Sequence, residues 1–244
     1  MSTPAGSPGT THPRQPARRG GGPATWWSKA VLRAVEEAAF SAQDLRAGRA
    51  LARAGAVGSI TVGEGNAVAA VTAGHDAYTV EVTVPVLDDS DAATFTELVA
   101  AESGRIAALL AGQLPHALVE AVEEAGVELL PYGGELGSAC TCEAWLDPCP
   151  HALAVLTQLA WLIQADPFVL THLRGLSRDR VLRDLHRITR PRAAEPTLDR
   201  ESLGDSGSRG APAGPDEVDD LVVAEDAAAR AARLLKQDRP FDSW

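Results

Sequence analysis

All three cysteines of the 244-residue chain lie within one ten-residue stretch, and this clustering constrains the fold more than any other feature. One residue separates Cys140 from Cys142, and one residue separates Cys149 from His151. Three thiolates and one imidazole are the ligand number and ligand types of a closed tetrahedral zinc site. We therefore predict that these four residues bind a Zn²⁺ ion.

The spacing of the ligands suggests how the backbone presents them. In an extended segment, residues i and i+2 point to the same side, so the first two cysteines can reach one ion together. Asp147 and Pro148 have the character of a helix cap and a first helical residue, which predicts a helix from there to about Gln164. The second pair of ligands would then lie near the first turn, where the helix dipole favours a thiolate at Cys149.

A zinc ion with four protein ligands has a full coordination sphere and no open position for water, so we expect a structural site. Metal binding then contributes to folding, by about 10 kcal/mol in small structural sites. The alternative interpretation is a set of buried or redox-active cysteines beside an unrelated histidine. A related alternative keeps the zinc but makes the thiolates a redox or zinc sensor, because oxidation would release the ion.

The rest of the chain predicts an α+β protein. Turn residues separate short apolar runs between residues 55 and 85, and Tyr78–Val84 alternates with the period of a strand buried on one face. We expect a small antiparallel β-meander with helices, followed by a zinc-stapled hairpin and further helices. Helices before and after residue 115 are expected to cover one face of this sheet, and a helical stretch is expected from Trp26 to about Arg46.

Composition divides the chain into five parts. Segments rich in Pro, Gly, Ser and Thr with few large apolar residues do not offset the entropy lost on ordering. We predict a disordered N-terminal tail (1–25), an α+β domain (26–131), a zinc finger with its following helices (132–190), a flexible linker (191–217) and a C-terminal helix (218–244).

Two features around the predicted finger are candidates for contact with a partner. Trp145 is expected to pack against the helix after the finger, which is apolar nearly all round, with partner binding as the alternative. Arginines of a later predicted helix could contact phosphate or an acidic protein. Arg180, Arg183 and Arg187 follow at spacings of three and four, and Arg174 and Arg178 are nearby. A plain solvated face, partly neutralised by Asp184, is the alternative for these arginines.

Composition and motif searches restrict the function further. The net charge of -11 argues against indiscriminate coating of DNA, and residues 61–139 carry thirteen acidic side chains and one basic. The sequence has no run of about 18 apolar residues and no apolar leader segment, so we expect a cytoplasmic protein without membrane contact. No phosphate loop, HExxH or GxSxG motif is present, and we predict neither an enzyme nor a small-molecule substrate.

The segment from Cys140 to His151, which reads Cys-Thr-Cys-Glu-Ala-Trp-Leu-Asp-Pro-Cys-Pro-His, resembles the SWIM zinc finger, whose pattern is Cys-x-Cys, a variable gap and Cys-x-His. Further segments resemble bacterial stand-alone SWIM proteins, so that the resemblance covers about residues 26–190. They are Trp26-Trp27, Gly48-Arg49 to Val57, the meander, Asp166-Pro167-Phe168 and Leu173-Arg174-Gly175.

The resemblance implies that Cys140, Cys142, Cys149 and His151 are the zinc ligands and that the module binds DNA or protein partners. Bacterial members are often associated with Swi/Snf-type helicase-like ATPases, so the resemblance implies an accessory adaptor acting with such an ATPase. A module that binds only protein is the alternative. Pro150 stands where many members place a lysine, which removes a phosphate contact and weakens the DNA interpretation.

Overall fold

The computed structural model describes residues 9–19, 25–142 and 144–189. The chain divides into two compact units, Met1–Arg192 and Ala193–Trp244, and all described residues belong to the first. The predicted linker (191–217) and C-terminal helix (218–244) lie outside the described residues.

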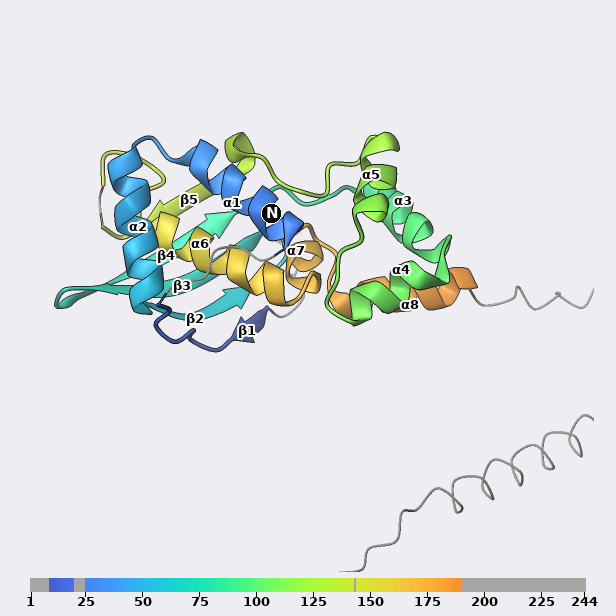
Figure 1. Ribbon diagram of the computed structural model, residues 1–244, viewed down its shortest axis with the longest axis horizontal. Coiled ribbons are helices and arrows are strands. Elements are labelled where there is room, and N and C mark those ends of the chain that lie inside the picture. The colour runs from blue at the N-terminus through green and yellow to red at the C-terminus, as the bar shows by residue number, and fades with distance from the viewer. Residues whose placement is uncertain (1–8, 20–24, 143, 190–244) are drawn as a thin grey trace, which may run out of the picture. The chain divides into compact units, whose positions relative to one another are not determined.

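One antiparallel sheet forms the centre of the first unit, and its strands are hydrogen-bonded in chain order (Figure 1). The alternation seen in the sequence becomes alternating burial along the strands, because one face packs on the core. The strands are β1 (Thr10–His12), β2 (Val57–Val62), β3 (Asn66–Ala73), β4 (Asp76–Thr83) and β5 (Gly137–Cys140). The predicted meander corresponds to β2, β3 and β4, and the predicted α+β class is confirmed.

The predicted disordered tail (1–25) does not hold for residues 9–19. Residues 10–12 form β1 on the outer edge of β2, and Arg14 Nε donates a hydrogen bond to the Gly55 carbonyl oxygen at 2.8 Å. Composition could not reveal this order because the segment is held by backbone groups of β2 and of the helix at Ala42–Ala54 and its cap, rather than by its own apolar side chains.

Helices account for most of the remaining described residues, together with a 3₁₀ turn at Gly133–Glu135. They are α1 (Trp26–Ala38), α2 (Ala42–Ala54), α3 (Asp89–Ala100), α4 (Ser103–Leu110), α5 (His116–Glu124), α6 (Pro150–Ala165), α7 (Phe168–Leu173) and α8 (Arg178–Thr189). The helical stretch expected to reach Arg46 is broken, because the Ser41 hydroxyl accepts a hydrogen bond from the Asp44 amide at 3.0 Å and starts α2 there.

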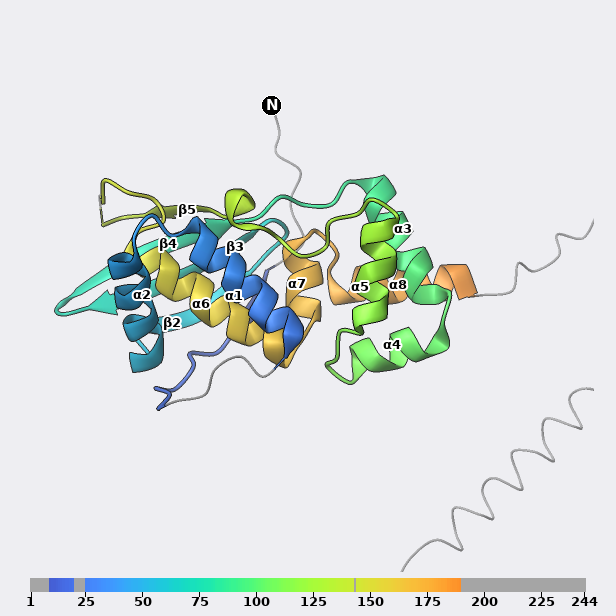
Figure 2. The same ribbon diagram turned by 45° about the horizontal axis from the view of Figure 1, so that its top comes forward.

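Helix α6 is the central helix of the core. It contacts β2 to β5 on one side and α1 and α2 on the other, as Figures 1 and 2 show. Leu153, Val155 and Ile163 are at most 1% exposed, as the nearly all-round apolar sequence of this helix predicts. The indole Nε1 of Trp27 donates to the Ile163 carbonyl oxygen at 3.1 Å and joins α1 to α6.

The helices between the sheet and the finger pack elsewhere than expected. Helix α3 contacts α4, α5 and α8, and these four form a separate group (Figure 2). The prediction that helices on either side of residue 115 cover the sheet is wrong, because α6 already occupies that face. In the part of the chain that the structure describes, no helix is both long enough and apolar enough to cross a membrane.

Candidate metal centre

The sheet positions the first two thiols. Cys140 is the last residue of β5 and lies opposite Val80 of β4, so its backbone is fixed by strand pairing. The turn that follows is also fixed to β4, because the Thr79 amide donates to the Thr141 hydroxyl at 3.0 Å and the Thr141 amide donates to the Thr79 carbonyl oxygen at 3.1 Å. Cys142 sits in this turn, two residues beyond the end of the strand.

The N-terminus of α6 positions the other two ligands. Cys149 itself is the N-cap, and its Sγ accepts a hydrogen bond from the Ala152 amide at 3.5 Å. Pro150 is the first helical residue, and His151 follows it in the first turn. The helix therefore begins two residues later than Asp147 and Pro148 suggested. The N-cap is the thiol of Cys149, whereas the sequence predicted the carboxylate of Asp147.

All four predicted ligands converge. Their donor atoms lie within 4.8 Å of one another, and His151 Nδ1 is 3.9 Å from Sγ of both Cys140 and Cys149. On one tetrahedral zinc ion, a sulfur bonded at about 2.3 Å and a nitrogen bonded at about 2.0–2.1 Å stand about 3.6 Å apart, and two sulfurs stand about 3.8 Å apart. The donor set and its spacing therefore fit zinc.

The electrostatics of the cluster also suit a cation. Burial raises the pKa of Cys140 to about 12 and also raises the pKa of Cys149, because a thiolate loses hydration there. Burial lowers the pKa of His151, so the imidazole is neutral near pH 7 and ready to coordinate. A bound divalent cation reverses the effect on the thiols and holds them as thiolates.

One contact to the site was missed in the sequence. The ring of Tyr78, on β4, stacks on the imidazole of His151. The alternation of β4 predicted a strand at this position, but the contact depends on β5 pairing with β4 and on α6 crossing beside them, which no local pattern encodes.

The loop between the two ligand pairs differs from the prediction. Trp145 is fully exposed and Leu146 is 47% exposed, so the expected packing of Trp145 on α6 is wrong. The physical reason is that the sheet, α1 and α2 already cover α6. The loop between Cys142 and Cys149 therefore presents the apolar side chains of Trp145 and Leu146 to solvent.

The structure separates the five predicted arginines. Arg174 is only 4% exposed, and it donates hydrogen bonds to the carbonyl oxygens of Pro85, at 2.7 Å, and of Glu128. Its guanidinium also lies 3.7 Å from the Glu135 carboxylate. The prediction that Arg174 contacts phosphate or a partner is wrong, because the residue joins three segments inside the fold.

The other four arginines lie on α8. Arg180 pairs with Asp89 at 3.1 Å and is 3.9 Å from Asp184, which also pairs with Arg187. Arg178 lies over the Phe168 ring at 5.2 Å, and Arg183 lines a cavity. Acidic neighbours thus neutralise much of the predicted face.

Comparison with known proteins agrees with the geometry. Residues 124–160 match the family model of the SWIM zinc finger, and all four convergent side chains fall in this range. The chain contains a SWIM zinc finger. The metal of this site is therefore zinc, and the SWIM finger joins β5 to the start of α6.

A bacterial relative extends the similarity beyond the finger. Over 164 residues the chain is 30% identical to the uncharacterized protein Rv2102 of Mycobacterium tuberculosis. The alignment covers 66% of this chain and 58% of the relative, so the chain spans less than two thirds of that protein's length. No solved structure matches the chain significantly.

Proposed function

We propose that the SWIM finger is a structural, non-catalytic site and that the chain acts as an adaptor that binds a protein partner. Four protein donors complete a tetrahedral zinc ion, so no coordination position remains for water or substrate. The ion instead links the end of β5 to the start of α6, and so fixes both ends of the loop between them.

The observation that carries the proposal is the exposure of Trp145. This residue is fully exposed, and Leu146 beside it is 47% exposed, on a loop whose flanking residues Cys142 and Cys149 are both zinc ligands. Holding the ends of the loop lowers the entropy lost when a partner orders it. Burying one tryptophan removes about 200 Å² of surface from water, which contributes up to about 5 kcal/mol. Such a residue is a typical binding anchor.

The partner that the SWIM resemblance implies is a Swi/Snf-type helicase-like ATPase. Direct DNA binding has less support in this fold. Arg174 is buried, and Arg180 and Arg187 are paired with carboxylates. Pro150 occupies the position where a lysine would add a phosphate contact. A protein contact through the finger loop uses none of these residues.

Affinity for the purified helicase-like ATPase, measured by biolayer interferometry, tests the proposal. Trp145→Ala should weaken binding at least about tenfold, which corresponds to about 1.4 kcal/mol. Leu110→Ala is the matched control, because Leu110 is 48% exposed but lies on α4. Zinc content and melting temperature should stay unchanged in both variants. Equal affinities of the two variants for the ATPase would contradict an anchor at Trp145.

A second measurement separates protein binding from DNA binding. Fluorescence anisotropy with duplex DNA over a salt series should show only weak binding that is independent of Trp145. If the protein binds DNA itself, affinity falls by about 0.9 log units per log unit of salt for each phosphate contact, and Arg180→Gln or Arg183→Gln reduces that slope. That result would replace the protein adaptor with a DNA adaptor.

The sensor alternative also has a distinct outcome. A structural zinc ion held by a buried Cys149, which is 2% exposed, should remain bound under mild peroxide. Rapid stoichiometric release, followed with a chromogenic zinc indicator, would instead support a redox sensor.

A further inference from the structure

Two large apolar side chains are unusually exposed among the residues that the structure describes. Trp145 is fully exposed and Phe40 is 68% exposed, more than any other large apolar side chain in these ranges. Trp145 belongs to the finger loop (143–148), whereas Phe40 lies in the connection between α1 and α2. The packing of these two helices on α6 decides whether the two side chains share one surface.

Helix α2 runs in the same direction as α6. A Cβ at Gly48 would stand 2.6 Å from Leu153 Cβ, and one turn further along both helices Gln158 Nε2 donates to the Ala52 carbonyl oxygen at 2.9 Å. With a rise of about 1.5 Å per residue, the start of α2 extends about 4–5 Å beyond the start of α6. The first turn of α2 therefore lies at the zinc end of α6.

Helix α1 runs in the opposite direction and leads to the same end. At its start, Trp27 Nε1 donates to the Ile163 carbonyl oxygen at 3.1 Å, and the Ser28 hydroxyl donates to the Ala160 carbonyl oxygen at 3.4 Å. The last turn of α1 therefore lies toward the metal centre. Phe40 follows this turn, and Figures 1 and 2 both show the connection between α1 and α2 beside the finger loop.

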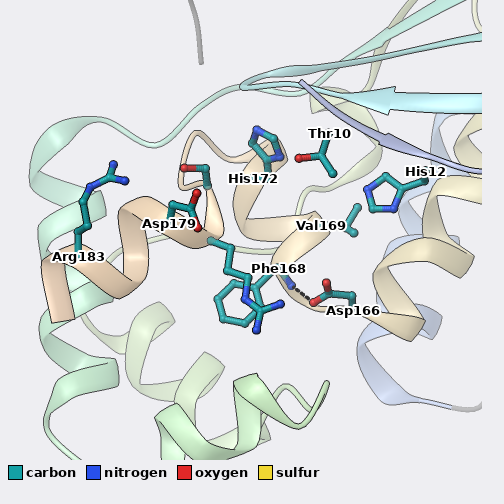
Figure 3. A pocket seen from close by; sticks show the side chains of 10 residues that line it. Thr10, His12, Asp166, Phe168, Val169, His172, Asp179 and Arg183 are labelled. Atoms are coloured by element: carbon teal, nitrogen blue, oxygen red, sulfur yellow. Dashed lines mark hydrogen bonds between the residues drawn. The ribbon is translucent and has the colours of Figure 1, made fainter. Parts of the chain in front are cut away.

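The opposite end of α6 has a different character. Asp166, the C-cap of α6, faces a cavity between β1, α7 and α8 (Figure 3). The apolar residues that line this cavity, Phe168 and Val169, are at most 6% exposed. Exposed apolar side chains therefore gather at the zinc end of α6 and not at its other end.

Local structure does not account for the exposure of Phe40. Ser41 is the N-cap of α2, so Phe40 and Leu45 occupy the two positions of a hydrophobic staple. Leu45 is partly buried against the core, yet Phe40 keeps most of its surface in solvent. Isolated apolar side chains are common on protein surfaces, whereas several at one end of a fold mark an interaction site.

The charge around these side chains is negative. Three thiolates exceed the charge of one Zn²⁺ ion by one, and the imidazole is neutral. Asp147 is exposed in the finger loop, and Asp44 lies in the first turn of α2, where Arg46 offsets one charge. Glu36 and Glu37, near the end of α1, are already paired with arginines. A partner segment that combines apolar side chains with Lys or Arg fits this balance.

We propose that Phe40, Trp145 and Leu146 form one docking surface, the zinc-end surface, for an amphipathic helix whose apolar stripe is flanked by Lys or Arg. Packed helices such as α2 and α6 are about 8–10 Å apart, and side chains at i and i+7 of a helix are about 10 Å apart. A helix of two to three turns therefore reaches both anchors. This inference rests on the proposed adaptor function and adds a second anchor and the class of partner segment.

A model peptide tests the surface without the natural partner. Fluorescence anisotropy would follow a labelled amphipathic helix of leucine and lysine that binds the full-length, zinc-loaded protein. Phe40→Ala and Trp145→Ala should each weaken this binding by at least about fivefold, and Leu110→Ala, on α4, should not. A peptide of leucine and glutamate should bind at least about tenfold more weakly. Equal affinities of all variants, or preference for the glutamate peptide, would overturn the proposal.

The helicase-like ATPase separates this inference from the proposed function. Phe40→Ala should weaken binding of the ATPase by at least about tenfold, as Trp145→Ala does. If only Trp145→Ala weakens it, and Phe40→Ala matches Leu110→Ala, the adaptor function stands and the shared surface fails. If the unmodified protein does not bind the ATPase, the adaptor function with that partner fails, and the peptide series still decides the zinc-end surface.

A charge series keeps the Phe40 ring in place, so it does not depend on the staple. Gln43 is exposed in the first turn of α2, three residues after Phe40. Gln43→Arg should weaken binding of the leucine–lysine peptide by about two- to fivefold and Gln43→Glu should strengthen it, with both effects smaller at high salt. The opposite order would mean an acidic partner segment and would contradict the proposal. Melting temperature and zinc content should be the same in both variants.

Discussion

The phenol ring of Tyr78 and the imidazole of His151 are stacked, with centroids 4.3 Å apart and planes inclined by 22°. The stack fixes the orientation of a zinc ligand from the neighbouring strand. Residues that orient metal ligands contribute to metal affinity although they do not touch the ion.

Removing this ring should therefore loosen the metal site. We expect Tyr78→Ala to weaken zinc binding by about 2- to 10-fold, since an aromatic pair contributes about 0.5–1.5 kcal/mol. Competition with a chromogenic chelator measures this effect. Tyr78→Phe keeps the ring and should retain nearly full affinity, whereas an equal loss in both variants would mean that the hydroxyl matters instead.

Zinc affinity should rise with pH. Burial raises the pKa of Cys140 to about 12 and also raises that of Cys149, so both thiols hold protons in the metal-free fold and must release them to bind zinc. Each released proton makes the apparent dissociation constant fall about tenfold per pH unit. His151 contributes little near neutral pH, because its lowered pKa leaves it already neutral.

The stability of the metal-free protein should follow the opposite trend and fall as pH rises. A thiol whose pKa is raised by folding binds its proton more tightly in the folded state, so its contribution to stability is present below the ordinary thiol pKa of about 8.5 and is lost as pH rises toward about 12. Chelator competition at several pH values and alkaline melting of the apo form measure the two trends. A pH-independent zinc affinity would contradict protonated thiols in the apo state.

Arg174 should be important for stability rather than for binding. Replacing Arg174 with methionine leaves the carbonyl oxygens of Pro85 and Glu128 without their donor, and leaves the Glu135 carboxylate without its cation. We expect a loss of about 3–5 kcal/mol in the free energy of unfolding, measured by chemical denaturation. Arg187→Met, with an exposed side chain, should change stability by less than about 1 kcal/mol.

Gly48 allows α2 to approach the start of α6. A Cβ at this position would stand 2.6 Å from Leu153 Cβ and 2.8 Å from the Pro150 carbonyl oxygen. Gly48→Ala should destabilise the fold by about 1–3 kcal/mol and also lower zinc affinity, because Pro150 lies between two ligands. Thermal unfolding with and without a chelator measures both effects.

Gly104→Ala is the matched control for this substitution. Gly104 lies in α4, and a Cβ there would have no neighbour within 4 Å. Alanine should be neutral or stabilising at this position, by up to about 1 kcal/mol. If both substitutions destabilised equally, close packing of α2 on α6 would not be the cause.

The elements that the sequence predicted well are those whose signal is local. The zinc ligands could be named because two short spacings bring three thiols and an imidazole into a few residues. The meander followed from alternation along Tyr78–Val84, which becomes alternating burial along β4. In each case the physical cause acts within one element or one turn of the chain.

Only the tertiary structure decided the contacts between segments that are distant in the sequence. Arg174 was grouped with the cationic face because it lies near those arginines in the sequence, but the chain folds it inward onto Pro85 and Glu128. Trp145 has the large apolar side chain that is typical of a core residue, but the sheet, α1 and α2 already cover α6, so Trp145 stays exposed. Such contacts depend on which surfaces of α6 the sheet and the first two helices cover, and side-chain type and spacing do not encode that competition.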